Sequence, residues 1–117
     1  MGETMAPAGS QWIVRIAELE IDPVHLDVYR DLLSEEIDAS VATEPGVLSL
    51  QAVALKDAPA QIRILEIYAS EAAYQAHLQT PHFLKYKRLT MAMVRALRLV
   101  DVDPIMMRAK ALPGDSR

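Results

Sequence analysis

Apolar and polar residues follow several different periods along this chain, and each change of period marks an expected element. Residues 12–20 form an apolar, β-rich run. Asp22-Pro23 then favours a helix start, because aspartate can cap a first turn and proline fits its first position. Further on, apolar residues recur every three to four positions, which predicts an amphipathic helix to about Thr43. The predicted apolar stripe of this helix is Leu26, Tyr29, Leu33, Ile37 and Val41, and Glu44-Pro45-Gly46 is expected to end it.

The second half of the chain returns to strand periodicity and then to helix. Residues 47–55 and 61–69 are predicted strands, joined into a hairpin by a turn at Asp57-Ala58-Pro59. Ser70 can cap a short helix through Gln79, and Thr80-Pro81 then starts another helix, which the apolar spacing extends to about Leu97. Residues 99–109 are expected to form the last strand, with Pro104 at an edge or a bulge.

The predicted order is β-α-β-β-α-β, with the second helical segment divided in two. This order indicates an α+β, ferredoxin-like fold of the split βαβ type, in which helices cover one face of a four-stranded antiparallel sheet. A chain of 117 residues fits one domain. We assign that domain to residues 11–110, with a flexible N-terminal tail at 1–10 and a C-terminal tail at 111–117.

The first and third predicted strands carry apolar residues on both faces. Ile13 and Val14 are adjacent in the first strand, as are Ile64 and Leu65 in the third. A sheet that is covered on only one face should instead alternate apolar and polar residues. The simplest cover for the second face is another copy of the sheet, stacked about 10 Å away, so we expect a homodimer through the open sheet face.

Composition narrows the classes of function. The chain has no cysteine, which excludes disulfides, thiolate nucleophiles and Cys-ligated metal centres. Its formal net charge of −4 argues against a nucleic-acid partner. No apolar run approaches the roughly 18–20 residues that span a bilayer, and residues 1–11 do not resemble a signal peptide. We therefore expect a cytoplasmic protein without membrane or nucleic-acid partners.

Two of the three histidines, His77 and His82, flank the Thr80-Pro81 helix break. On one continuous helix they would point about 140° apart, but a change of direction at the proline could aim both at one pocket between helices and sheet. Histidine transfers protons near neutral pH, so both are candidate catalytic bases. The alternative is that they only bond neighbouring side chains. Their spacing misses the i,i+4 metal pattern and no compact carboxylate cluster completes a ligand set, so we expect no metal.

Glu66 is the third candidate catalytic residue, because it shares a predicted strand face with apolar residues. A carboxylate in such a place usually has a partner or a function. Arg15 interrupts an apolar face of the first strand, so a buried Arg15–Glu66 ion pair competes with a role for Glu66 in orienting a histidine or a substrate hydroxyl. We expect Tyr68, Phe83 and Tyr86 to wall the pocket and contact substrate, with Arg15 as a further contact, although the aromatic stripe could equally be core.

The sequence of residues 66–83, EIYASEAAYQAHLQTPHF, together with Glu44-Pro45-Gly46-Val47-Leu48 before it, resembles the antibiotic biosynthesis monooxygenase superfamily and most closely its quinol monooxygenase branch. The resemblance covers roughly residues 12 to 105. It implies a dimeric α+β barrel and oxygenation of small electron-rich aromatic substrates by O2, without metal, flavin or other cofactor. A deprotonated hydroquinone or polyphenol can itself reduce O2, so such an enzyme needs chiefly a base and a dry pocket.

Three interpretations of the function are open. The first is a cofactor-independent monooxygenase that oxidises a quinol, a polyphenol or another electron-rich aromatic molecule. The second, haem degradation, is disfavoured because that branch relies on an asparagine and a tryptophan near a histidine ligand, and this chain contains no asparagine. The third is a non-catalytic dimeric small-molecule-binding protein, or a metabolite isomerase on the same fold, since a fold does not fix a function.

Overall fold

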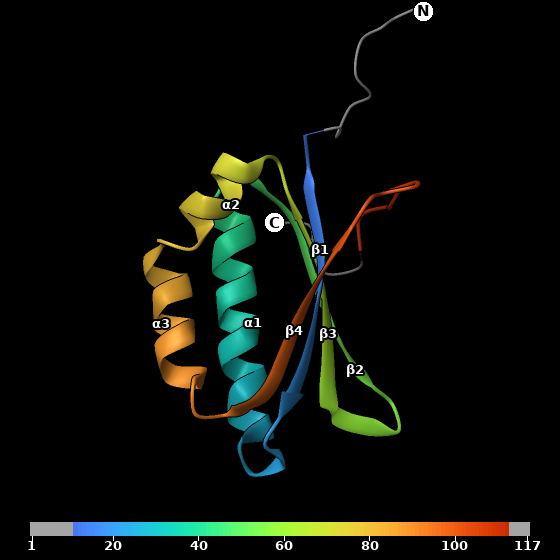
Figure 1. Ribbon diagram of the computed structural model, residues 1–117. Helices are drawn as coiled ribbons and strands as arrows, with labels where there is room; N and C mark the ends of the chain where they lie inside the picture. The colour runs from blue at the N-terminus through green and yellow to red at the C-terminus, as the bar shows by residue number, and fades with distance from the viewer. Residues whose placement is uncertain (1–10, 113–117) are drawn as a thin grey trace, which may run out of the picture.

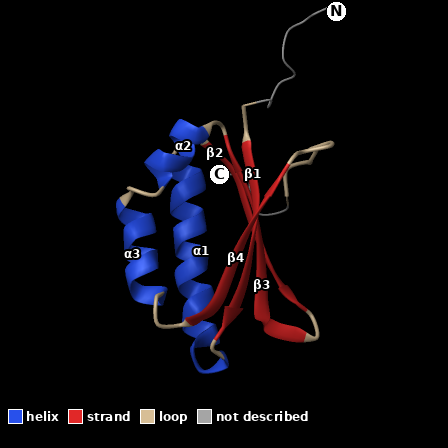
Figure 2. Cartoon of the chain, viewed as in Figure 1, coloured by secondary structure: helices blue, strands red, loops and turns tan. Residues whose placement is uncertain are grey.

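The computed structural model describes residues 11–112, so the tail predicted at 1–10, and the tail predicted at 111–117 apart from its first two residues, lie outside this range. Four strands form one antiparallel sheet in the order β2-β3-β1-β4, and the helices lie together on one side of it (Figures 1 and 2). The α+β, ferredoxin-like fold is confirmed. In chain order the elements are β1 (Ile13–Ile21), the short 3-10 turn η1 (Pro23–His25), α1 (Leu26–Thr43), β2 (Val47–Leu55), β3 (Ala58–Tyr68), α2 (Glu71–His77), α3 (Pro81–Thr90) and β4 (Val94–Val102).

The helix starts use the capping residues that the sequence indicates. Asp22 accepts a hydrogen bond from the backbone N–H of Val24, although Pro23 opens a 3-10 turn and α1 itself begins three residues later. The side chains of Ser70 and Thr80 each accept a hydrogen bond from a backbone N–H in the first turn of α2 and α3 respectively. The Thr80-Pro81 break therefore separates two helices, as predicted.

The end of α3 and the start of β4 differ from the prediction. α3 ends at Thr90 rather than near Leu97, and β4 begins at Val94 and ends before Pro104. β4 pairs with β1 along its whole length, with a register irregularity between Glu20 and Ile21. Apolar residues continue at helical spacing past the end of α3. Backbone hydrogen bonds to β1 nevertheless stabilise an extended strand there.

The core lies between the helices and the sheet. Alternate residues of β1 and β3 face the helices, and Ala17 and Ile64 are directly opposite each other in this layer. Val14 and Ile67 form the equivalent pair on the other face of the sheet, where they are also buried. Apolar residues thus occupy both faces of the central strands. No helix within residues 11–112 is long and apolar enough to cross a membrane.

Candidate functional site

A cavity of about 590 Å³ lies between the helices and the sheet face that they cover. This volume falls in the range of roughly 300–1,000 Å³ that is usual for small-molecule sites. Most of the wall is apolar, from side chains such as Leu19, Leu33 and Ile64. The titratable and aromatic side chains that line it are Glu36, Glu66, Tyr68, Tyr74, His77, Phe83, Tyr86, Lys87 and Arg95.

His77 is almost completely buried, with 2% of its surface exposed. It is the last residue of α2, so its position depends on the Ser70 cap at the start of that short helix. Its ring centre lies 4.9 Å from that of Phe83 and 5.3 Å from that of Tyr68. The imidazole is therefore held between aromatic rings on the cavity wall.

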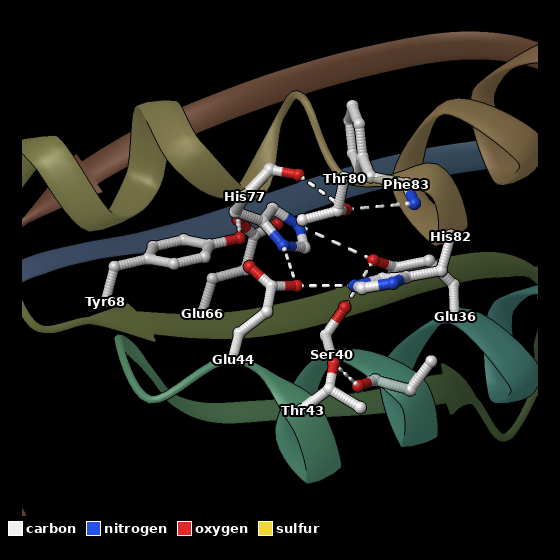
Figure 3. A network of polar contacts seen from close by, with 11 residues as sticks. Glu36, Ser40, Thr43, Glu44, Glu66, Tyr68, His77, Thr80, His82 and Phe83 are labelled. Atoms are coloured by element: carbon white, nitrogen blue, oxygen red, sulfur yellow. Dashed lines mark hydrogen bonds and ion pairs between the residues drawn. The ribbon is translucent and has the colours of Figure 1, made fainter.

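Glu44, which follows the end of α1, joins the two histidines (Figure 3). Its Oε2 lies 3.0 Å from Nδ1 of His77 and 2.5 Å from Nε2 of His82. Burial acts to raise the pKa of Glu44, but the hydrogen bonds to His82 and His77 outweigh it, and the pKa is lowered. An ionised Glu44 favours the tautomer of His77 that carries its proton on Nδ1, which leaves Nε2 as the basic nitrogen.

Glu36 lies on the other side of His77 and comes from the buried face of α1. It is 5% exposed, and Oγ of Ser40 donates to its Oε2 over 2.7 Å. The same oxygen lies 3.5 Å from Nε2 of His77. Burial raises the pKa of Glu36, against the opposing effects of the Ser40 hydrogen bond and of His77. Glu36 therefore places a second carboxyl group beside Nε2 of His77.

Glu66 and Tyr68 form a third polar contact on the wall. The Tyr68 hydroxyl donates to Oε1 of Glu66 over 2.9 Å, and burial raises the pKa of both groups. Arg15 is opposite Glu66 in the β1–β3 register, but its Nε donates to Asp101 over 2.8 Å. Arg15 is thus ion-paired with Asp101 of β4, the strand on the other side of β1, and its charge acts on Glu66 only electrostatically.

The predicted site residues divide into two groups. His77, Glu66, Tyr68, Phe83 and Tyr86 all line the cavity, as a shared pocket requires. Two residues do not line it.

His82 and Arg15 form the second group. His82 lies behind the wall, in a depression of about 50 Å³ between α1 and α3. The guanidinium of Arg15 stacks on Tyr74, 4.5 Å from the ring centre. The prediction that both histidines face one pocket is therefore wrong for His82. The helix break does bring the two rings within 6.4 Å of each other, but their meeting point is Glu44.

The sequence analysis missed Glu36, Ser40 and Glu44. A helical projection carries a signal for the first two, because Glu36 and Ser40 are one turn apart and lie on the same helix face as Tyr29 and Leu33 of the apolar stripe. The residues around Glu44 indicate only a helix stop. The expectation that nothing completes a metal-ligand set with the histidines overlooked Glu36: ligand atoms of Glu36, His77 and His82 all lie within 4.8 Å of one another. Imidazole and carboxylate are ligands that suit divalent transition metals.

Known proteins resemble the chain over most of its length. The sequence model of the antibiotic biosynthesis monooxygenase family matches residues 12–89. The crystal structure of a "putative antibiotic biosynthesis monooxygenase" from Bacteroides thetaiotaomicron VPI-5482 is 47% identical, with a TM-score of 0.85 over 89% of this chain and 99% of that one. A structure from Pseudomonas aeruginosa, with 20% identity and a TM-score of 0.76 over 84% of this chain and 98% of that one, is similar in fold. Among curated proteins, none matches the sequence.

Proposed function

Because this chain belongs to the antibiotic biosynthesis monooxygenase family, we propose that it is a cofactor-independent monooxygenase that oxidises a quinol, a polyphenol or another small electron-rich aromatic molecule with O2. The family and the similar structures support a monooxygenase-type function. The substrate class and the use of O2 are our inference from the chemistry of the cavity.

The observation that carries this proposal is the environment of His77. Its ring is buried on the wall of a mainly apolar cavity, and Glu44 engages Nδ1 so that Nε2 remains to accept a proton. A carboxylate that orients a histidine base from behind is a common arrangement in enzymes. In this cavity it would ionise the hydroxyl of a bound aromatic molecule.

The overall reaction needs no outside reductant when the substrate is a quinol. Nε2 of His77 takes a hydroxyl proton, and the resulting anion is electron-rich enough to give electrons to O2. One oxygen atom is inserted into a C–H bond of the ring, and the other leaves as water. The quinol therefore loses four electrons in total and ends as a hydroxylated quinone. The proton held by His77 returns to the departing oxygen, and the base is regenerated.

The other cavity residues would bind and orient the substrate. Phe83 and Tyr86 offer aromatic surface, and the apolar wall excludes water, which would otherwise compete for the anion. The Tyr68–Glu66 pair presents a carboxylate oxygen to the cavity and can orient a second substrate hydroxyl. His82 would act only through Glu44, as a positioning residue.

A proton-shuttling isomerase and a non-catalytic binding protein are the competing interpretations. The same base could move a proton within a metabolite without oxygen, and the same cavity could bind a ligand without reacting. Consumption of O2 and the fate of its atoms separate the monooxygenase from both alternatives, and conversion of a ligand without O2 separates the isomerase from the binding protein.

The test is an oxygen-electrode screen of chelator-treated protein against hydroquinones, naphthoquinols, catechols and larger polyphenols. With isotopically labelled O2, mass spectrometry should find one labelled oxygen atom in the product and the other in water. His77→Ala and the more conservative His77→Gln should lower the rate by on the order of 10² or more, the usual contribution of a general base. His82→Ala should cost clearly less, because His82 does not touch the cavity.

His25→Ala is the matched control, because His25 lies in η1 and does not line the cavity. Its rate should equal that of the wild type. Circular dichroism checks that each variant is folded. Full activity in folded His77→Ala and His77→Gln would refute the catalytic role, and hydrogen peroxide as the only oxygen product would indicate an oxidase instead.

A further inference from the structure

Three side chains of metal-ligating types, from three different helices, converge at the cavity wall. They are Glu36 of α1, His77 at the end of α2 and His82 in the first turn of α3. We infer that these residues form a binding site for a divalent transition-metal cation such as Zn²⁺ or Co²⁺. The inference rests on the geometry of this cluster and is independent of the proposed monooxygenase activity.

The spacing of the ligand atoms fits a small cation. Oε2 of Glu36 and Nε2 of His77 are 3.5 Å apart, which is too long for a good hydrogen bond. Two ligands of a tetrahedral metal with bonds of about 2.0–2.1 Å lie roughly 3.4 Å apart. One edge of the coordination polyhedron therefore already has the required length.

The third ligand needs only a small movement. The ligand atoms of all three residues lie within 4.8 Å of one another, so His82 must approach by about 1 Å to reach metal-bonding distance. The His82 side chain is 20% exposed and lies less tightly packed than His77. Its contact with Glu44 Oε2 would be exchanged for a metal bond.

The surrounding hydrogen bonds are those that orient metal ligands. A metal-bound histidine usually donates its other ring N–H to a carboxylate, and a metal-bound carboxylate is itself hydrogen-bonded. Glu44 takes the first role toward Nδ1 of His77, and Ser40 takes the second toward Glu36. Nε2 of His77 then faces Oε2 of Glu36, the oxygen that also accepts the hydrogen bond from Ser40 (Figure 3).

The charge of the region also favours a cation. Glu36 is buried, and two further carboxylates, Glu44 and Glu66, interact with it electrostatically. Glu44 also contacts His77, the histidine that lies beside Glu36. Buried carboxylates are stable only with partners that offset their charge. Two imidazoles and one carboxylate favour Zn²⁺, Co²⁺ or Fe²⁺ over Mg²⁺ and Ca²⁺, which prefer oxygen ligands.

Metal binding would use the nitrogen of His77 that the proposed reaction needs as a base. A bound cation and general-base catalysis by His77 therefore exclude each other, and Zn²⁺ is expected to suppress O2 consumption by the chelator-treated enzyme. Loss of activity alone does not identify the site, so the test measures binding directly.

The experiment titrates Co²⁺ into untagged, chelator-treated full-length protein and follows the visible absorption of the ion, with Zn²⁺ competition by calorimetry. The wild type should bind one equivalent per chain. His82→Ala and Glu36→Gln should each weaken binding by about 100-fold or more, and Glu44→Gln by roughly 10-fold, as expected for an outer-shell partner. His25→Ala, which removes a histidine elsewhere, should bind like the wild type.

Two results would overturn the site. One is the absence of Co²⁺ and Zn²⁺ binding to the wild type, and the other is unchanged binding in folded His82→Ala and Glu36→Gln. Because binding is followed without any substrate, the outcome is separate from the oxygen-electrode result. An inactive protein that binds Co²⁺ supports the metal site and not the proposed function, and an active protein that binds none supports the reverse.

Discussion

Tyr29 is completely buried in α1, and its hydroxyl has the hydroxyl of Tyr86 as a partner at 2.6 Å. The two rings are 6.0 Å apart and join α1 to α3. Tyr86 also lines the cavity, so this contact connects the packing of the helices to the wall of the site. Burial raises the pKa of Tyr86 to about 12, which keeps it neutral as a hydrogen-bonding group.

Removal of both hydroxyls from this pair should lower the free energy of unfolding by less than the sum of the two single removals. Tyr86→Phe leaves the buried Tyr29 hydroxyl without this partner and should lower the free energy of unfolding by about 1–3 kcal/mol. The double variant with Tyr29→Phe should lose less than the sum of the two single variants, because no polar group is then left unpaired. Urea denaturation measures all four proteins, and strictly additive losses would contradict the proposed pairing.

The placement of α2 depends on a close contact with the loop before β2. Gly46 lies in that loop, and its carbonyl accepts a hydrogen bond from the backbone N–H of Ala69. A Cβ atom built on Gly46 would lie 2.4 Å from the Cβ of Ala73 in α2. The same two segments carry Glu44 and His77, so this contact sets the distance between the orienting carboxylate and the base.

Gly46→Ala should therefore disturb both stability and the site. The added methyl group must push α2 away from the loop, at a cost of about 1–3 kcal/mol in the free energy of unfolding. Ala73→Gly should restore the space, so the double variant should be more stable than the sum of the single changes predicts, despite the roughly 1 kcal/mol cost of glycine in a helix. Thermal or urea unfolding provides the measurement, and a Gly46→Ala protein as stable as the wild type would show that the contact relaxes without cost.

The whole molecule has an asymmetric sheet, with helices on one face only (Figure 2). On the other face, Leu65, Ile16 and Val100 form an apolar row across β3, β1 and β4, and all three are partly exposed. A contiguous apolar surface on a sheet is typical of an interface. We propose that a second copy of the chain covers this face and forms a two-fold homodimer.

Light scattering at micromolar concentration should give about twice the mass of the chain. Leu65→Glu places a charge in the middle of the apolar row and should yield a folded monomer or a much weaker dimer, since a buried unpaired charge is costly. Val24→Glu, at a position that is 84% exposed, is the control and should remain dimeric. A monomeric wild type, or a Leu65→Glu protein that dimerises as tightly as the wild type, would refute this interface.

Much of the fold could be predicted because its signals are local. A cap such as Ser70 or Thr80 acts on the next turn of backbone, and the stripe of α1 repeats within a few residues, so the element order and the helix break follow from neighbouring positions. The boundary between α3 and β4 failed for the opposite reason. There the local apolar spacing suits a helix, and only pairing with β1, which lies far away in the chain, selects a strand.

For the candidate site, the sequence by itself determined which kinds of side chain are present and that His77 lies at a helix corner near an aromatic strand end. Tertiary structure decided their partners. Glu44 reaches His77 across 33 positions of the chain and His82 across 38, and Arg15 finds Asp101 across 86. Such contacts carry no periodic or capping signal, because they depend on how α1 and the sheet edges pack in three dimensions. The fold therefore follows from local chemistry, whereas the pairing of base, carboxylate and candidate metal ligands exists only once the helices are packed on the sheet.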